Sequence, residues 1–196
     1  MSFVTYLRLI NHSNDSNNDE VVIFQGNVSE DLRELHIAWQ VIRNLGVGDS
    51  HPFTYPIAST VAASDSFGNT TTPMDASPGA AFEMIRKRSG DVLEYAGQST
   101  NPDEIEVRNN LERGAISALV FKSGKLLLSQ TGIVPLQKAV FEIEPIISVG
   151  VASQVVEGVS VSSAVLSQVN TQFDLMGVKS AGIIMTGGNW CECDAV

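Results

Sequence analysis

The chain has 196 residues, a hydrophobic fraction of 43% and a formal net charge of −10. The hydrophobic fraction excludes a disordered chain, and the acidic balance argues against nucleic acid and anionic membranes as partners, because both select a basic surface. Charged residues make up 17% of the chain, against roughly 25% in an average soluble protein. Because interface cores are also poor in charge, this composition favours self-association.

The first two predicted strands cover residues 3–10 and 20–25, where β-branched and aromatic residues are concentrated. The stretch from Asn11 to Asn18 between them is polar. This pattern predicts a hairpin with a long loop.

Residues 29–46 fit two structures. Leu32, Leu35, Trp39 and Ile42 fall on one face of a helix, whereas Ile37, Trp39 and Val41 alternate with polar or small residues as in a strand. The β-rich surroundings favour a strand over 36–43. Residues 46–56 contain Gly and Pro and are expected to form a loop that leads into an extended segment.

The remaining predicted strands are short and bounded by turn residues: 57–63, 81–88, 92–98, 115–122, 125–130, 138–144, 146–151, 159–173 and 179–185. Two pairs of them form hairpins, around Ser89-Gly90-Asp91 and around Ser123-Gly124. Seven or more short strands with frequent turns are typical of a sandwich. We therefore predict an all-β fold, a β-sandwich or jelly-roll-like structure, as a single domain over 1–196.

The two halves of the chain share a pattern. Residues 9–26 run from apolar residues through Asn11 and a polar loop to VVIFQG, and residues 107–124 run from apolar residues through Asn109 and a loop to ALVFKSG, about 97 residues later. This echo predicts related halves at 1–100 and 101–188, followed by a tail at 189–196. Convergent patterning of strands and turns explains the echo equally well.

A candidate metal site lies in the first polar loop. Asp15, Asn17 and Asp19 alternate as oxygen ligands do in calcium-binding loops. The loop departs from an EF-hand, since Glu20 occupies the position of the turn glycine and Gly26 that of the bidentate glutamate. We expect either a calcium site of another type at these three residues or a solvated loop.

No pattern for catalysis is present in the sequence. The histidines His12, His36 and His51 have no spacing that indicates convergence on a metal. There is no Gly-x-Ser-x-Gly segment and no phosphate-binding Gly-x-x-x-x-Gly-Lys loop. We therefore predict that the protein is not an enzyme and that it has no cofactor other than calcium.

Cys191 and Cys193 are too close in sequence for an easy internal disulfide, and two ligands are too few for a structural zinc site. They fit free thiols, an inter-subunit disulfide or half of a shared metal site. At the other end, Met1 to Arg8 lacks the features of a secretion signal. The expected location is cytoplasmic, or extracellular by a leaderless route.

The segment from Pro145 to Phe173 carries one charged residue, Glu157, and its apolar residues alternate with Ser, Gln and Asn. Such alternation is typical of half-buried strands and also of membrane barrels. The segment is expected to form two core strands joined near Gly158, an inter-subunit interface, or a membrane-inserting element.

Three stretches carry a resemblance to a known group of proteins. They are Leu9-Ile10-Asn11, Val22-Ile23-Phe24-Gln25 and Ala38-Trp39-Gln40-Val41. This progression resembles small bacterial proteins described as rhizosphere-expressed, over about the first 85 residues. That resemblance implies a bacterial origin, a β fold and a strand around Trp39. It implies no activity, since the group has none established.

Together these features predict a non-enzymatic structural protein that self-assembles into a homopolymer, such as a filament, tube or ring, through β-strand contacts. Two other readings remain open. One is a lectin-like module that binds a glycan through loops around Asp65–Asn69 and Trp190. The other is a membrane-active, pore-forming protein that uses residues 145–173.

Overall fold

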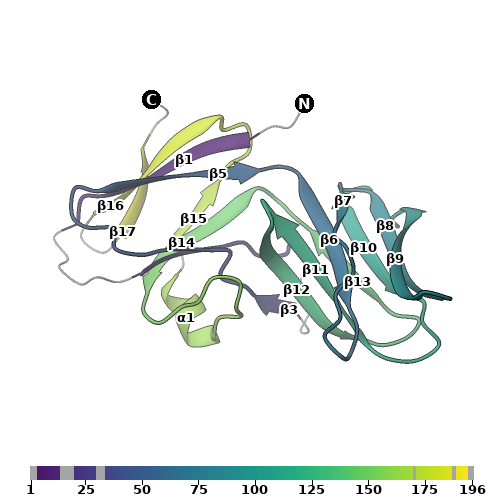
Figure 1. Cartoon of the computed structure of the whole chain (residues 1–196). Helices are drawn as coiled ribbons and strands as arrows, with labels where there is room; N and C mark the ends of the chain where they lie inside the picture. Colours follow the sequence, from purple (N-terminus) through teal and green to yellow (C-terminus); the bar gives the residue numbers. More distant parts are fainter. Residues whose placement is uncertain (1–3, 14–19, 30–33, 170, 187–188, 194–196) are drawn as a thin grey trace. The chain divides into compact units, whose positions relative to one another are not determined.

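The computed structural model describes residues 4–13, 20–29, 34–169, 171–186 and 189–193. Within these ranges the chain forms seventeen β-strands and one short helix, α1 (Ser163–Gln168), and the strands make four sheets (Figure 1). The prediction of an all-β, sandwich-like fold is confirmed.

The contacts of the chain divide it into two compact units. Unit 1 comprises residues 1–26, 36–57 and 145–196, and unit 2 comprises residues 27–35 and 58–144. The chain therefore passes from unit 1 to unit 2 twice and returns twice. The expectation of a single domain over 1–196 stays a prediction, because it concerns whether the two units fold together.

Unit 1 contains two four-stranded sheets, with the orders β17-β16-β1-β5 and β15-β14-β2-β4. The bounds are β1 Val4–Asn11, β2 Glu20–Phe24, β4 Gln40–Ile42, β5 Ser50–Pro56, β14 Ile146–Ala152, β15 Thr171–Asp174, β16 Ser180–Thr186 and β17 Asn189–Cys193. β1 and β16 run parallel, and the other neighbouring strands are antiparallel.

Unit 2 contains sheets with the orders β13-β10-β8-β9 and β3-β12-β11-β6-β7. The bounds are β3 Glu34–His36, β6 Ser59–Ser64, β7 Met74–Ala76, β8 Ala80–Lys87, β9 Gly90–Gln98, β10 Glu104–Asn109, β11 Ile116–Lys122, β12 Lys125–Ile133 and β13 Lys138–Glu142. β8 and β10 run parallel, while β8–β9, β10–β13, β11–β12, β6–β11 and β6–β7 are antiparallel.

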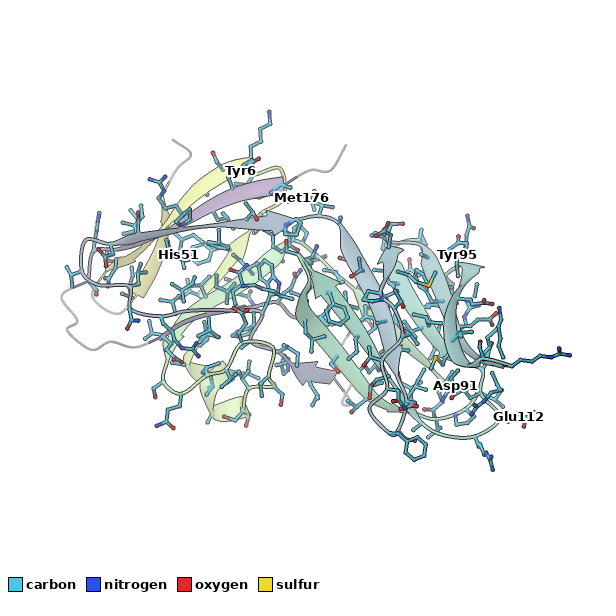
Figure 2. All side chains as sticks on the ribbon, in the orientation of Figure 1. Tyr6, His51, Asp91, Tyr95, Glu112 and Met176 are labelled. Atoms are coloured by element: carbon cyan, nitrogen blue, oxygen red, sulfur yellow. The ribbon has the colours of Figure 1, made fainter. Side chains whose placement is uncertain are left out.

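Alternation along the strands decides which side chains enter each core. In β1, Leu7 and Leu9 are buried, whereas Tyr6 is 64% exposed and points away from the sheet (Figure 2). The core of unit 1 is centred on Trp39, which is fully buried and meets the Tyr55 ring edge-on at 5.7 Å. The Tyr55 hydroxyl is 3.0 Å from Gln25 Oε1, so this buried polar group is satisfied.

Two predicted elements are wrong. Residues 3–10 and 20–25 do not form a hairpin, because β1 pairs with β16 and β5 while β2 lies in the other sheet, between β14 and β4. Residues 159–173 do not form one strand, because 163–168 is helix α1. The apolar residues Val161, Val165 and Val169 recur every four positions, so the same residues that alternate also match a helix.

Other expectations are confirmed in outline. The segment 36–43 contains strand and no helix, although β3 ends at His36 and β4 begins only at Gln40. The turn at Ser123-Gly124 joins β11 to β12, with φ of 51° and 72°, as the two positive values of a type I′ hairpin require. The sequence pattern missed β5, whose Pro52 and Pro56 argue against a strand. Both are tolerated because β5 lies at a sheet edge.

Candidate functional site

Unit 1 is assembled from the two ends of the chain. We call residues 1–26 and 36–57 the N-terminal segment, and residues 145–196 the C-terminal segment. Each sheet of unit 1 takes two strands from each segment, β1 and β5 with β16 and β17, and β2 and β4 with β14 and β15. The line along which β1 meets β16 and β2 meets β14 is called the seam below.

The first half of the seam is a parallel strand pair. β1 and β16 are in register from Tyr6 opposite Ser180 to Asn11 opposite Met185. The pairing extends past the start of β16 and past the end of β1, since the Tyr6 N–H donates to the Lys179 carbonyl and the His12 N–H to the Met185 carbonyl, both at 2.9 Å. Parallel strands need a long connection, and here it is most of the chain (Figure 1).

The second half of the seam is apolar. β2 pairs antiparallel with β14, with Phe24 opposite Ser148 and Val22 opposite Gly150. A buried cluster follows the same line, with three members from each segment: Val22, Phe24 and Ala38 from the N-terminal segment, and Ala152, Val155 and Val169 from the C-terminal segment. The valines of α1 and its flanks therefore contact residues at the far end of the chain.

Gly150 sets how closely the end of α1 approaches the sheet. A Cβ atom on Gly150 would lie 2.6 Å from the Cα atom of Val169 and 2.7 Å from its Cγ1 atom. The atoms in the way are the Cα atom of Val169 and its buried side chain, so no side-chain rotation would relieve the clash. The sequence alternation of residues 145–173 gave no sign of this contact.

A polar clasp borders the apolar part of the seam. Glu20 and Arg43 of the N-terminal segment form an ion pair at 2.6 Å. Glu20 also accepts from the Val155 N–H at 2.9 Å, and Arg43 donates to the Val155 carbonyl at 3.1 Å. The hydrogen bond from Arg43 is the main reason that the pKa of Glu20 lies below its usual value. The clasp therefore satisfies both backbone groups of one C-terminal residue.

Three further backbone hydrogen bonds cross the seam beside the clasp. The Ala38 N–H donates to the Val159 carbonyl, the Gly158 N–H donates to the Ala38 carbonyl, and the Val161 N–H donates to the His36 carbonyl. Glu157 Oε2 accepts from the Val41 N–H at 3.2 Å. Hydrogen bonds to backbone groups depend on register, so the seam is a specific fit between the two segments.

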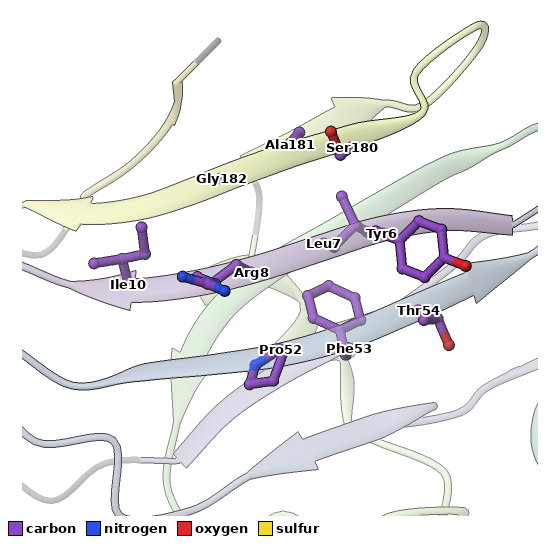
Figure 3. Close-up of a pocket in the computed structure, with 10 residues that line it drawn as sticks. All are labelled: Tyr6, Leu7, Arg8, Ile10, Pro52, Phe53, Thr54, Ser180, Ala181 and Gly182. Carbon is purple, nitrogen blue, oxygen red and sulfur yellow. The ribbon is translucent and has the colours of Figure 1, made fainter. Parts of the chain in front are cut away.

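A groove of about 680 Å³ lies on the sheet β17-β16-β1-β5 (Figure 3). Its outward residues come from three strands: Tyr6, Arg8 and Ile10 from β1, Pro52 and Thr54 from β5, and Ser180 and Gly182 from β16. Gly182 is opposite Arg8 and leaves room beside it, because it has no side chain. Within the described ranges, Arg8 is in none of the ion pairs.

Unit 2 has a buried carboxylate in β10, at Glu106. Glu106 is fully buried and is 2.6 Å from both Lys138 and Arg108. It also accepts from the Thr100 N–H at 2.8 Å. Burial alone would raise the pKa of Glu106, but the hydrogen bonds from Lys138, Thr100 and Arg108 lower it to about 2.

The residues predicted as a calcium site, Asp15, Asn17 and Asp19, lie outside the described ranges. In the part of the chain that is described, no three His, Cys, Asp or Glu side chains gather as metal ligands would. His12, His36 and His51 are each exposed and lie apart along the sequence. The calcium site stays a prediction.

The other predicted site residues are dispersed. Cys191 and Cys193 lie in β17, opposite Ile184 and Gly182. Trp190 is in the same strand, whereas the Asp65–Asn69 loop belongs to unit 2. Asp65 accepts from the Phe67 and Asn69 backbone and from the Asn69 side chain, so its oxygens are engaged within the loop. No helix among the described residues is long and apolar enough to cross a membrane.

Comparison of the chain with protein-family models, with curated proteins and with solved structures gives no match in any of the three. The resemblance to rhizosphere-expressed proteins therefore stays a prediction.

Proposed function

We propose that this protein is a non-enzymatic structural protein that assembles with copies of itself by exchanging its C-terminal segment. The observation that carries the proposal is the construction of unit 1 from the two ends of the chain. Unit 2, by contrast, is built almost entirely from the continuous stretch 58–144. In the sequence of one copy, unit 2 therefore stands between the two segments that together make unit 1.

The same seam can form within one copy or between two. If the C-terminal segment of one copy pairs with the N-terminal segment of the next, every hydrogen bond and apolar contact of the seam is retained. Exchange of an identical element between copies is a low-cost route to association, and a head-to-tail contact of this kind generates an open filament or, if it closes, a ring. Residues 143–145, where the chain passes from unit 2 into the C-terminal segment, are the expected hinge.

The exposed sheet edge formed by β5 favours exchange over simple edge-to-edge addition. Pro52 and Pro56 lack the backbone N–H that a further strand would need. An added strand would therefore form an incomplete ladder on β5. The seam offers complete ladders, because β1 and β2 of the N-terminal segment pair with β16 and β14 of the C-terminal segment.

Negative-stain electron microscopy of the purified protein tests the proposal, with and without added calcium because of the predicted site at Asp15, Asn17 and Asp19. We expect regular filaments, tubes or rings. Their dependence on calcium would support the metal prediction, and their presence in both conditions would separate assembly from calcium. Small monodisperse particles at all concentrations and in both conditions would refute assembly.

A second candidate function rests on the groove. Tyr6 offers an exposed aromatic face, Arg8 a cation outside any ion pair of the described residues, and Thr54 and Ser180 offer hydroxyls. This set suits a glycan that carries a carboxylate, since sugars stack on aromatic rings and arginine binds carboxylates in a fork.

Retention on an immobilised polyuronate tests this second function. Y6A and R8A should each lose retention, whereas R88A, which removes another exposed arginine, should keep it. Equal retention of all three variants would show that the groove takes no part.

A further inference from the structure

The two units have the same strand arrangement. The sheet β17-β16-β1-β5 of unit 1 corresponds to β9-β8-β10-β13 of unit 2, and β15-β14-β2-β4 corresponds to β7-β6-β11-β12. In each unit one pair is parallel, β1–β16 in unit 1 and β8–β10 in unit 2, and it occupies the same place in the same sheet.

The registers of the two units agree as well. Asn11 at the end of β1 lies opposite Met185, and Asn109 at the end of β10 lies opposite Met84. The next residue donates to that methionine in both cases, from the His12 N–H to the Met185 carbonyl and from the Asn110 N–H to the Met84 carbonyl. In the second sheets, Phe24 lies opposite Ser148 and Phe121 opposite Thr60.

The two asparagines also make matching hydrogen bonds. The Asn11 side-chain amide donates to the Leu45 carbonyl, and that of Asn109 donates to the Ile133 carbonyl, both at 2.7 Å. Each Oδ1 accepts from the backbone N–H two residues later, at Ser13 and at Leu111.

The turn that faces each asparagine matches too. The Asn11 carbonyl accepts from Gly48 and the Asn109 carbonyl from Leu136. Gly48 and Leu136 both have positive φ, 86° and 68°. A leucine rarely adopts this conformation, so its presence at the position equivalent to a glycine points to a retained backbone path.

We infer that the chain is a tandem duplication whose two repeats have exchanged halves. The first repeat runs from β1 to β9 and the second from β10 to β17, while β3 and α1 have no counterpart. Unit 1 combines the first half of the first repeat with the second half of the second repeat. Unit 2 combines the two remaining halves. Each half of one repeat therefore pairs with the complementary half of the other repeat.

One difference between the units follows from the connectivity. In unit 2, β9 and β10 are joined by residues 99–103, and Thr100 of this connection caps Glu106. In unit 1 the corresponding strands, β17 and β1, stand at opposite ends of the described chain. The position equivalent to Glu106 is Arg8, which lines the groove. The equivalent position thus carries a buried carboxylate paired with two cations in unit 2 and an exposed arginine in unit 1.

Circular permutation of the full chain tests the equivalence. Joining Val196 directly to Met1 and opening the chain between Asn101 and Pro102 would give unit 1 the β17–β1 connection and remove the β9–β10 connection from unit 2. The joined residues 194–196 and 1–3 are similar in number to residues 99–103, so no added linker is needed. We expect the permutant to fold with the same circular dichroism spectrum.

A control permutant opened at the Ser123–Gly124 turn cuts a hairpin that is internal to one repeat. The duplication is overturned if the control folds and the permutant opened at Asn101 does not. If neither permutant folds, a second measurement tests the exchange of halves on a chain that has folded in its natural order.

For this second measurement, a specific protease site is inserted between Asn101 and Pro102 and cut after folding. With exchanged halves, each unit contains strands of both fragments, so the cleaved protein should elute from a sizing column at the volume of the uncleaved protein. Separation of the fragments without denaturant would overturn the exchange. Both measurements read the fold and not assembly, so they can fail independently of the proposed polymer.

Discussion

Asn11 and Asn109 end equivalent strands in different units, and each joins its strand to the facing turn through its side-chain amide. Both are almost completely buried. Alanine at either position would leave a buried N–H without a partner, together with a half-buried carbonyl at Leu45 or a buried one at Ile133, which costs about 1–3 kcal/mol. N109A should destabilise more than N11A, because Asn109 also donates to the Gly114 carbonyl.

Urea unfolding followed by circular dichroism measures both variants. N110A is the matched control, since the Asn110 side chain donates to Glu83 at the surface, and its effect should stay within about 0.5 kcal/mol. Equal and negligible effects of all three substitutions would contradict the structural role given to the two asparagines.

Glu106 should make the stability of unit 2 depend on acid. Its folded-state pKa of about 2 lies below the ordinary value of 4.5, so its stabilising contribution is present above pH 4.5 and is lost as the pH falls towards 2. The shift corresponds to about 3 kcal/mol. E106Q should lower stability at pH 7 by a similar amount and flatten the stability between pH 4.5 and 2. An unchanged acid profile in E106Q would show that other carboxylates control it.

Lys122 should act in the opposite direction at high pH. Burial lowers its pKa to about 8 from the ordinary 10.5, so the folded state disfavours the charged form. The free energy of unfolding should therefore rise as the pH increases from about 8 to 10.5. K122M should stabilise the protein at pH 7 by up to about 3 kcal/mol and remove this rise. Thermal unfolding at several pH values checks both, and a loss of stability in K122M would show that the interactions of the ammonium outweigh its burial.

Gly150 should tolerate no side chain. Alanine there would meet the Val169 backbone, which we expect to displace α1 and destabilise unit 1 by about 1–3 kcal/mol. Gly26 is the control, because a Cβ atom there would have nothing within 4 Å. Hydrogen exchange resolved by segment should show faster exchange at 146–152 in G150A only. Protection in this segment equal to that of G26A would contradict the close packing.

The sequence predicted the strands well where one face alternates cleanly, as in Ile116–Lys122 and Lys138–Glu142. It failed at Ser163–Gln168, where apolar residues spaced by four fit the periods of both a strand and a helix. There the Ser162 side chain caps the first turn and stabilises the helix. It could not predict the seam. Which strands pair across the length of the chain depends on tertiary contacts such as Gly150 with Val169, and a local pattern carries no record of them.

The repeated pattern in residues 9–26 and 107–124 is the one feature of the sequence analysis that involved strands of the seam. It placed Asn11 beside Asn109, but strand patterning alone could not show that their neighbours come from opposite repeats. The groove was missed because Tyr6 and Arg8 look like ordinary outward positions of a strand. Their significance depends on Gly182 and Pro52, which lie opposite Arg8 in the two neighbouring strands.

Exchange across the seam can be tested by complementation between two defective copies. V22D spoils the N-terminal segment alone, and V169D spoils the C-terminal segment alone, since both side chains are buried in the seam cluster. Neither variant can close unit 1 by itself. In a mixture, the sound C-terminal segment of V22D can pair with the sound N-terminal segment of V169D.

Light scattering after a sizing column gives the mass of each sample. We expect monomers for either variant alone and a heterodimer for the equimolar mixture. No longer species should form, because the second seam would join the two substituted segments. A mixture that stays monomeric, while hydrogen exchange shows unit 2 folded in each variant, would contradict assembly by exchange of the C-terminal segment.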